Sequence, residues 1–445
     1  MKKLITLVLI ASAVVTAKSQ EGATAPVLLN YNTVQKKVVK SDEAIQDAKK
    51  SAKAKTWFDR GELYQEVFML GLEQVQEGMQ PSTLVLFYGE PSSIETETID
   101  GALHETYLYE HIHYVFVNSA LQEWKRVDPI AEEPLVLSME AYIKAIELDE
   151  DGKLEKKIKE NLTDLKNQFK REGVNHYYKE DFDGSLEAFE NVLTINNLAL
   201  FEGEMDTIMV QYSGIIAREI ADKTGNKELY KKSIEYYTQL AEADFGGPNT
   251  YLQIKMDYMT IGDTLKAMEV LKEAYEKYPD TINVVANIAD TYIQMGEIDE
   301  GLEFMEGVIE RSPEMAEAYY WKGRMLINKE EVEFIDQAIE SYNKAGELDP
   351  SIFYIWYDLG YIYYLQGADF YDRAAVETDG DMMARLNELG KEKYDAAFPV
   401  LEKAYELNTD NPTVKFETLD LLQRIYYKEQ MMDDYNRVKT LKENM

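Results

Sequence analysis

The sequence predicts a mainly α-helical protein, an array of repeated helical hairpins with a small antiparallel β insertion near its start. Glycine and proline make up only 24 and 11 of the 445 residues, which favours helices over a strand-rich fold. Prolines recur at Pro279, Pro313 and Pro350, 34 and 37 residues apart. Residues 105–117 instead alternate with the period of two that is typical of a β-strand.

The first 19 residues have the pattern of a secretory signal peptide. Lys2 and Lys3 precede an apolar run over residues 4–15, which is too short to cross a bilayer, and Ala17 and Ser19 form a small-x-small cleavage motif. We expect cleavage before Gln20 and an exported chain, periplasmic or secreted, that is soluble and has no integral membrane segment. Residues 20–53 are predicted to form a linker and a short helix.

Charge and cysteine content narrow the classes of partner. The formal charge is −35, and it becomes −38 once the three lysines of the signal peptide are removed. Such a surface repels nucleic-acid phosphates, so no nucleic-acid partner is expected. The chain has no cysteine, which excludes disulfides, thiolate chemistry and a lipid-modified cysteine.

Each of the three prolines closes one unit of a helix–turn–helix repeat. Glycines mark the turn inside the unit, and a small residue lies five positions before each proline. The residues at these positions are Gly262 and Gly296 in the turns, and Ala274, Val308 and Ala345 before the prolines.

These spacings resemble the tetratricopeptide repeat. The signature is fullest in residues 353–409, at Trp356, Leu359, Gly360, Tyr363, Ala397, Leu401 and Ala404. On this basis the repeat array covers residues 166–409, with a helical insertion at 365–393, and residues 410–445 form a C-terminal capping hairpin. The resemblance implies an α-solenoid whose concave groove binds a protein partner.

The first repeat is predicted to be split. Its first helix is expected at residues 54–70, its second helix and a connecting helix lie in residues 133–165, and an α+β module occupies residues 71–132. Within the module we expect a short helix at 82–88 and three or four antiparallel strands ending near Trp124. Residues 82–126 also resemble the small β-domains of outer-membrane assembly lipoproteins.

Two histidines in the module, His111 and His113, raise the question of a metal site. The alternation places both on one face of a strand, together with Glu105, and a break near Glu110 and His111 would divide this run into two strands. Their tyrosine and valine neighbours favour a packed sheet surface. A metal site is the alternative, but it would need three or four converging ligands. We predict no metal, no cofactor and no catalytic residue.

Binding is predicted in the concave groove. In tetratricopeptide arrays the groove is lined by positions 2, 5, 9 and 12 of each first helix. Carried onto this sequence, the resemblance implies a partner-binding set of Asp290, Tyr320, Arg324, Tyr354, Tyr357, Tyr361 and Tyr364. Two alternatives stay open: the tyrosines line an open groove, or residues 365–393 fold back and cover them.

The function that follows is a non-enzymatic scaffold for protein–protein contacts in the bacterial cell envelope, with the β-insertion as a second contact surface. The signal and repeat style resemble exported repeat proteins of Gram-negative bacteria of the Bacteroidetes type. Two other classes are alternatives: a metal-dependent or hydrolytic enzyme that uses the β-module, and a glycan-binding module. The partner and the oligomeric state are not specified by the sequence.

Overall fold

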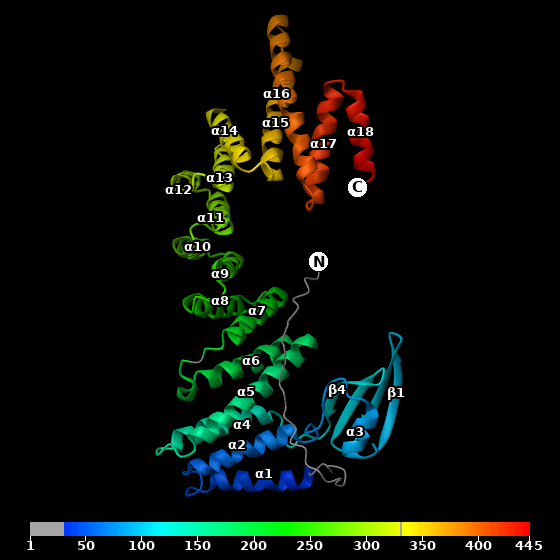
Figure 1. The fold of residues 1–445 in the computed structure, drawn as a ribbon, viewed down its shortest axis with the longest axis vertical. Coiled ribbons are helices and arrows are strands. Elements are labelled where there is room, and N and C mark those ends of the chain that lie inside the picture. Colours follow the sequence, from blue (N-terminus) through cyan, green and yellow to red (C-terminus); the bar gives the residue numbers. More distant parts are fainter. Residues whose placement is uncertain (1–30, 204, 330–331) are drawn as a thin grey trace. The chain divides into compact units, whose positions relative to one another are not determined.

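The computed structural model describes residues 31–203, 205–329 and 332–445 (Figure 1). The predicted signal peptide and the first part of the predicted linker lie outside these residues. The chain divides into two compact units, Met1–Asp206 and Thr207–Met445. Within the described ranges no helix combines the length and the apolar character needed to cross a bilayer.

In the first unit, a small sheet lies between helices in the order of the sequence. Its elements are α1 (Tyr31–Gln46), α2 (Ala54–Met69), α3 (Pro81–Tyr88), β1 (Ser93–Ile99), β2 (Ala102–Leu108), β3 (Ile112–Val117), β4 (Ala120–Arg126), α4 (Pro134–Leu148), α5 (Glu155–Tyr178), α6 (Phe182–Asn196) and the short 3-10 helix η1 (Ala199–Phe201).

The second unit, in its described part, is entirely helical. Its elements are α7 (Thr207–Thr224), α8 (Lys227–Glu242), α9 (Pro248–Ile261), α10 (Thr264–Lys277), α11 (Ile282–Met295), α12 (Ile298–Arg311), α13 (Ala316–Ile327), α14 (Val332–Leu348), α15 (Phe353–Val376), α16 (Gly380–Leu407), α17 (Pro412–Lys428) and α18 (Met432–Glu443). Consecutive helices pack as hairpins, and each hairpin packs on the next. The predicted fold class, mainly α with an early antiparallel sheet, is confirmed.

Glycine allows the two helices of a hairpin to approach closely. A Cβ atom added at Gly173 of α5 would lie 2.4 Å from the ring of Phe189 on α6, and one added at Gly360 of α15 would lie 2.6 Å from Leu401 on α16. Both partner side chains are almost fully buried. The repeat signature therefore has a steric cause, because any larger residue would push the helices apart.

The Gly360→Ala change is expected to destabilise the second unit by about 1–3 kcal/mol, the usual cost of overpacking a core. Gly307 of α12 is a matched control, since a Cβ added there meets nothing within 4 Å. Gly307→Ala should stabilise the unit by about 0.5–1 kcal/mol, the ordinary gain of replacing a helical glycine. Urea unfolding of both variants tests this pair, and equal effects would contradict the steric explanation.

The sheet is a four-stranded antiparallel meander in the order β1-β2-β3-β4. Tight turns with positive φ at Asp100 and Gly101, and at Asn118 and Ser119, connect its outer pairs of strands. One face of the sheet packs on α3 and the segment before it (Figure 1). The buried residues of this cluster are Leu72, Val75, Leu84, Tyr88, Tyr107, Tyr109, Ile112, Tyr114, Phe116 and Leu121.

The prediction that His111 and His113 share a strand face with Glu105 is wrong. The strand breaks at Glu110 and His111, and β3 begins at Ile112. The break resets the alternation: Glu105 lies opposite Phe116, on the face of the sheet that packs on α3, while His113 lies opposite Leu108 on the other face. His111 instead stacks on the ring of Tyr31 from α1, with ring centroids 3.6 Å apart.

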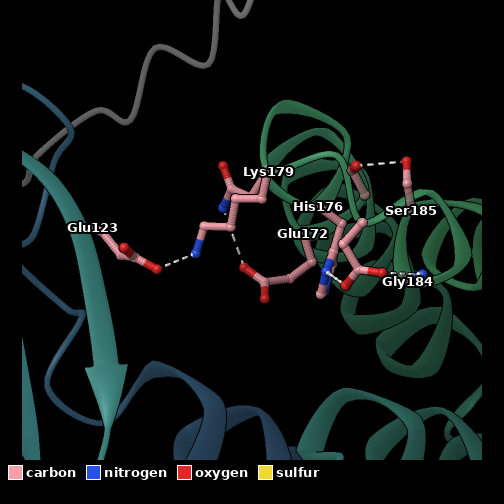
Figure 2. Close-up of polar contacts among 9 residues, drawn as sticks. Glu123, Glu172, His176, Lys179, Gly184 and Ser185 are labelled. Carbon is pink, nitrogen blue, oxygen red and sulfur yellow. Dashed lines mark hydrogen bonds and ion pairs between the residues drawn. The ribbon is translucent and has the colours of Figure 1, made fainter.

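A polar contact joins the sheet to the helices that follow it. Lys179, just after α5, forms an ion pair with Glu123 of β4 at 2.6 Å (Figure 2). Nearby, His176 Nδ1 lies 2.7 Å from Asp181 Oδ2, and Asp181 accepts a hydrogen bond from the backbone N–H of Gly184 at the start of α6. The predicted boundary between residues 165 and 166 falls inside α5, because this helix runs without interruption from Glu155 to Tyr178.

Candidate binding surface

The helix that carries the tyrosines has a well-defined start. Asp349 accepts hydrogen bonds from the backbone N–H and the hydroxyl of Ser351, which turns the chain before α15. Trp356 then donates its indole N–H to the carbonyl of Pro350 at 3.0 Å. These contacts fix the rotation of α15, and so the direction in which its side chains point.

Four tyrosines at spacings of three and four residues share one side of α15. We call this set the tyrosine face: Tyr354, Tyr357, Tyr361 and Tyr364. The predicted residues of α13 lie beside its first member. The rings of Tyr320 and Tyr354 lie 4.6 Å apart, centroid to centroid.

A partly buried carboxyl group, that of Asp358, which the sequence did not single out, links these two helices. Tyr320 donates its hydroxyl to Asp358 Oδ2 at 3.0 Å. Burial raises the pKa of Asp358, while the Tyr320 hydrogen bond and the Arg324 charge act to lower it. Three predicted residues, Tyr320, Arg324 and Tyr354, are therefore brought together, but as a supporting layer around Asp358.

The C-terminal hairpin holds two other members of the tyrosine face. Tyr357 donates its hydroxyl to Glu417 of α17 at 3.1 Å, and burial followed by the Glu417 charge raises the pKa of Tyr357. Tyr364 stacks on Tyr394 of α16 at 5.6 Å and is hydrogen-bonded to Arg424 of α17. Both tyrosines are half-buried.

The remaining member, Tyr361, is accessible. Its side chain is 42% exposed, and its ring stacks on Tyr357 with an interplanar angle of 7°. A ring that is held on one side and exposed on the other offers apolar area and a polar tip at little cost in conformational entropy. Tyr361 is thus the member of the tyrosine face best placed to contact another molecule.

Asp290 lies apart from this surface. Its carboxylate accepts a hydrogen bond from Gln294, one turn further along α11, at 2.5 Å. Its charge also acts on Lys255 of α9, whose pKa burial lowers.

Residues 365–393 lengthen α15 and α16. Within this extension, Tyr371 packs on Tyr394 at 5.3 Å. The partial cover over Tyr357 and Tyr364 comes from α17 and from Tyr394 of α16.

Glu417 and Arg424 were missed by the sequence analysis, although a signal for them existed. Each contacts a tyrosine 60 residues earlier, Tyr357 and Tyr364 respectively, which is one repeat lengthened by the insertion at residues 365–393. Treating the C-terminal hairpin as another repeat would have placed both at groove positions. The polar residues of this hairpin instead predict a cap.

In the described part of the chain, no three histidine, cysteine, aspartate or glutamate side chains are grouped so that they could hold a metal ion. His111 lies 3.8 Å from Glu110 and 3.9 Å from Asp128, measured between ring nitrogen and carboxylate oxygen. His113 lies on the other side of the sheet from the α3 cluster. The two histidines are therefore not brought together as a pair.

Successive helical hairpins that cross at glycine and carry aromatic residues on one helix face define a helical-repeat protein. A tetratricopeptide repeat family model matches residues 261–325, and a TPR repeat model matches residues 335–367. These matches show that residues 261–325 and 335–367 are tetratricopeptide repeats. Proteins with such repeats generally mediate protein–protein interactions.

Individual relatives are distant. A stretch of 136 residues is 26% identical to tetratricopeptide repeat protein 21A of Mus musculus, and it covers 28% of this chain and 10% of the mouse protein. The chain therefore spans only a small part of the length of this relative. A solved TPR repeats protein of Bacteroides fragilis is 17% identical, with 57% of this chain and 97% of that one covered and a TM-score of 0.31. The MamA protein is 21% identical, with 42% and 92% covered and a TM-score of 0.30.

Proposed function

We propose that this chain is a non-enzymatic scaffold of the bacterial cell envelope, and that its tyrosine face binds a protein partner. The observation that carries the proposal is Tyr361, a ring supported by Tyr357 on one side and exposed on the other. Around it, Glu417 and Arg424 supply one charge of each sign. Such a mixture of aromatic area and paired charges suits a peptide segment, because a peptide offers both apolar and polar groups.

The envelope location is supported by the signal-like pattern of residues 1–19. Its test is the N-terminus of the protein isolated from cell fractions. We expect the periplasmic fraction to contain a chain that begins at Gln20. A chain that begins at Met1 and stays in the cytoplasm would contradict the location and leave the binding proposal to be judged separately.

The Tyr361→Ala change is expected to weaken partner binding by about tenfold or more, the loss typical of a central aromatic contact. Because Tyr361 is 42% exposed, the free energy of unfolding should change by less than about 1 kcal/mol. The partner is first captured in intact cells by a photo-crosslinking residue placed at position 361. Its affinity for purified variants is then measured by calorimetry.

Tyr178 provides the matched control, since it is an exposed tyrosine of the first unit, 69% accessible. Tyr178→Ala should leave the affinity unchanged. A protein captured equally from positions 178 and 361 would not qualify as the partner. Unchanged binding in the double variant Tyr357→Ala, Tyr361→Ala would move the site away from the tyrosine face.

A further inference from the structure

The two edges of the β-sheet differ in what they contact. On the β4 edge, Leu121 exchanges two backbone hydrogen bonds with the loop before α3, donating to Met79 and accepting from Gly78 at 2.9 and 2.8 Å. Lys179 adds the ion pair to Glu123 (Figure 2). This edge is therefore partly closed by the protein's own chain.

The opposite edge, β1, is open. All seven residues Ser93–Ile99 are exposed, and β1 pairs with β2 alone. Among the described residues, no backbone hydrogen bond reaches β1 from the side away from β2. In an antiparallel pair, alternate residues point their N–H and C=O groups outward, so this edge offers a row of unused donors and acceptors.

β1 lacks several of the usual protections of an exposed edge. Natural sheets block such edges with charged side chains, lysine above all, or with proline or a β-bulge. The charged residues of β1 are the two glutamates Glu95 and Glu97, which repel an acidic strand and attract a basic one. The strand SIETETI contains neither lysine nor proline. The register shift of this sheet lies at the other side, between β3 and β4. The edge is thus suited to accept another strand, as in β-augmentation.

The charge around β1 indicates which kind of strand could pair with this edge. Residues 71–124 contain nine acidic residues and no lysine or arginine. Glu95 and Glu97 of β1 are both exposed and, two residues apart, point to the same face of the sheet. In an antiparallel pairing of two β1 strands centred on Thr96, Glu95 of each copy would lie opposite Glu97 of the other, which disfavours a second copy.

We propose that the β1 edge binds an extended segment of a partner protein, in which lysine or arginine alternates with aliphatic or β-branched residues. The added strand pairs antiparallel with β1, its basic side chains lie opposite Glu95 and Glu97, and its other residues lie beside Ile94 and Thr96. This assignment rests on the proposed role as an interaction protein, but it does not depend on the tyrosine face.

Disulfide trapping tests the proposal, because the chain has no cysteine and a single engineered thiol reports one position. The probe is the capped heptapeptide Thr-Thr-Lys-Cys-Lys-Val-Thr, whose cysteine lies opposite position 96 in the proposed register. The Thr96→Cys variant is equilibrated with this peptide in a glutathione redox buffer. The fraction of mixed disulfide is read by intact mass spectrometry.

The control thiol is Glu150→Cys, an exposed position flanked by Asp149 and Asp151 just as Thr96 is flanked by two glutamates. We expect trapping at Thr96→Cys to exceed trapping at Glu150→Cys by about tenfold, since strand pairing raises the effective concentration of the peptide. A peptide with proline in place of its second threonine and its valine, which lie opposite Thr98 and Ile94, keeps the charge but loses two N–H donors that would face β1, and it should lose this excess.

Several outcomes would overturn the proposal. Equal trapping at the two thiols, or full trapping of the proline peptide, would mean that no strand is added. Equal trapping of a peptide with glutamate in place of both lysines would refute the basic partner. A Thr96→Cys homodimer formed in preference to the mixed disulfide would identify a second copy as the occupant. Tyr361→Ala should leave trapping unchanged, so a failure here is distinguishable from a failure of the tyrosine face.

Discussion

Replacing Arg218 with methionine is expected to lower the free energy of unfolding of the second unit by about 3–5 kcal/mol, the cost of leaving a buried charge unpaired. Arg218 of α7 contacts Asp257 of α9 through Nε–Oδ1 at 2.6 Å and Nη2–Oδ2 at 2.8 Å. The two side chains are only 12% and 1% exposed. Removing the guanidinium leaves the carboxylate with no compensating charge in a site without water access.

The same variant should respond to pH. Burial raises the pKa of Asp257, and Arg218 works against this rise. A carboxyl group with a raised folded pKa binds its proton more tightly in the folded state. Its unfavourable contribution therefore grows as pH rises through the folded pKa and vanishes below the unfolded value of about 3.9. In Arg218→Met the folded pKa rises further, so the loss relative to the parent should be larger at pH 7 than at pH 4.

Urea unfolding at both pH values, followed by circular dichroism, measures this difference. Arg385→Met is the control, because Arg385 and Glu388 form an ion pair whose side chains are both more than half exposed. That change should cost less than about 1 kcal/mol. If both variants lose the same stability, or if the loss in Arg218→Met does not shrink toward pH 4, the buried pair does not have the assigned role.

The second large effect is expected in the β-module, where Tyr114→Ala should cost about 3–5 kcal/mol through the cavity that it leaves. Tyr114 is fully buried at the centre of the sheet, and Tyr109 packs edge-on against it at 5.6 Å. Its hydroxyl donates to the carbonyl of Gly71 at 2.5 Å and so ties β3 to the loop after α2. Hydrogen exchange should show lost protection in β2, β3 and β4.

Tyr114→Phe separates the two contributions. It keeps the ring but leaves the Gly71 carbonyl without its donor, for a cost of about 1–3 kcal/mol. Exchange in α7–α18 should be unaffected in both variants, because these helices belong to the other unit. Unchanged protection of the strands in Tyr114→Ala would show that the module does not depend on this residue.

The hairpins were predictable because their cause is local. Gly360 must be small where α15 crosses α16, and proline must end each unit, so the constraint recurs at a regular interval in the sequence. The four strands were predictable for the same reason, since alternation is a local signal. The phase across Glu110 and His111 was not, because a two-residue turn and a continuous strand have similar composition while a one-residue offset exchanges the two faces.

The candidate binding surface shows more clearly what the sequence alone could not predict. Spacing placed four tyrosines on one side of α15, but it could not say which of them stays accessible. That depends on Glu417 and Arg424, which lie on a helix 60 residues further along. The role of Asp358 could not be predicted either, since an acidic residue within a helix normally points to solvent and only the packed structure shows this one partly buried beside Tyr320 and Arg324.

The split first repeat gives the β-module an unusual mechanical support. The module leaves the helices after Met69 and rejoins them at Pro134, where α2 and α4 pack directly together. Ser138 donates to the carbonyl of Gly61 at 2.8 Å, and Tyr142 donates to Gln65 at 2.6 Å, so the two exit points are locked side by side. A domain fused at a chain end can rotate about a single linker. The β-module is connected to the helices at two points, which restricts its rotation. A strand bound on β1 would therefore be presented with restricted swivel, and pulling on it would load both helices of the hairpin at once.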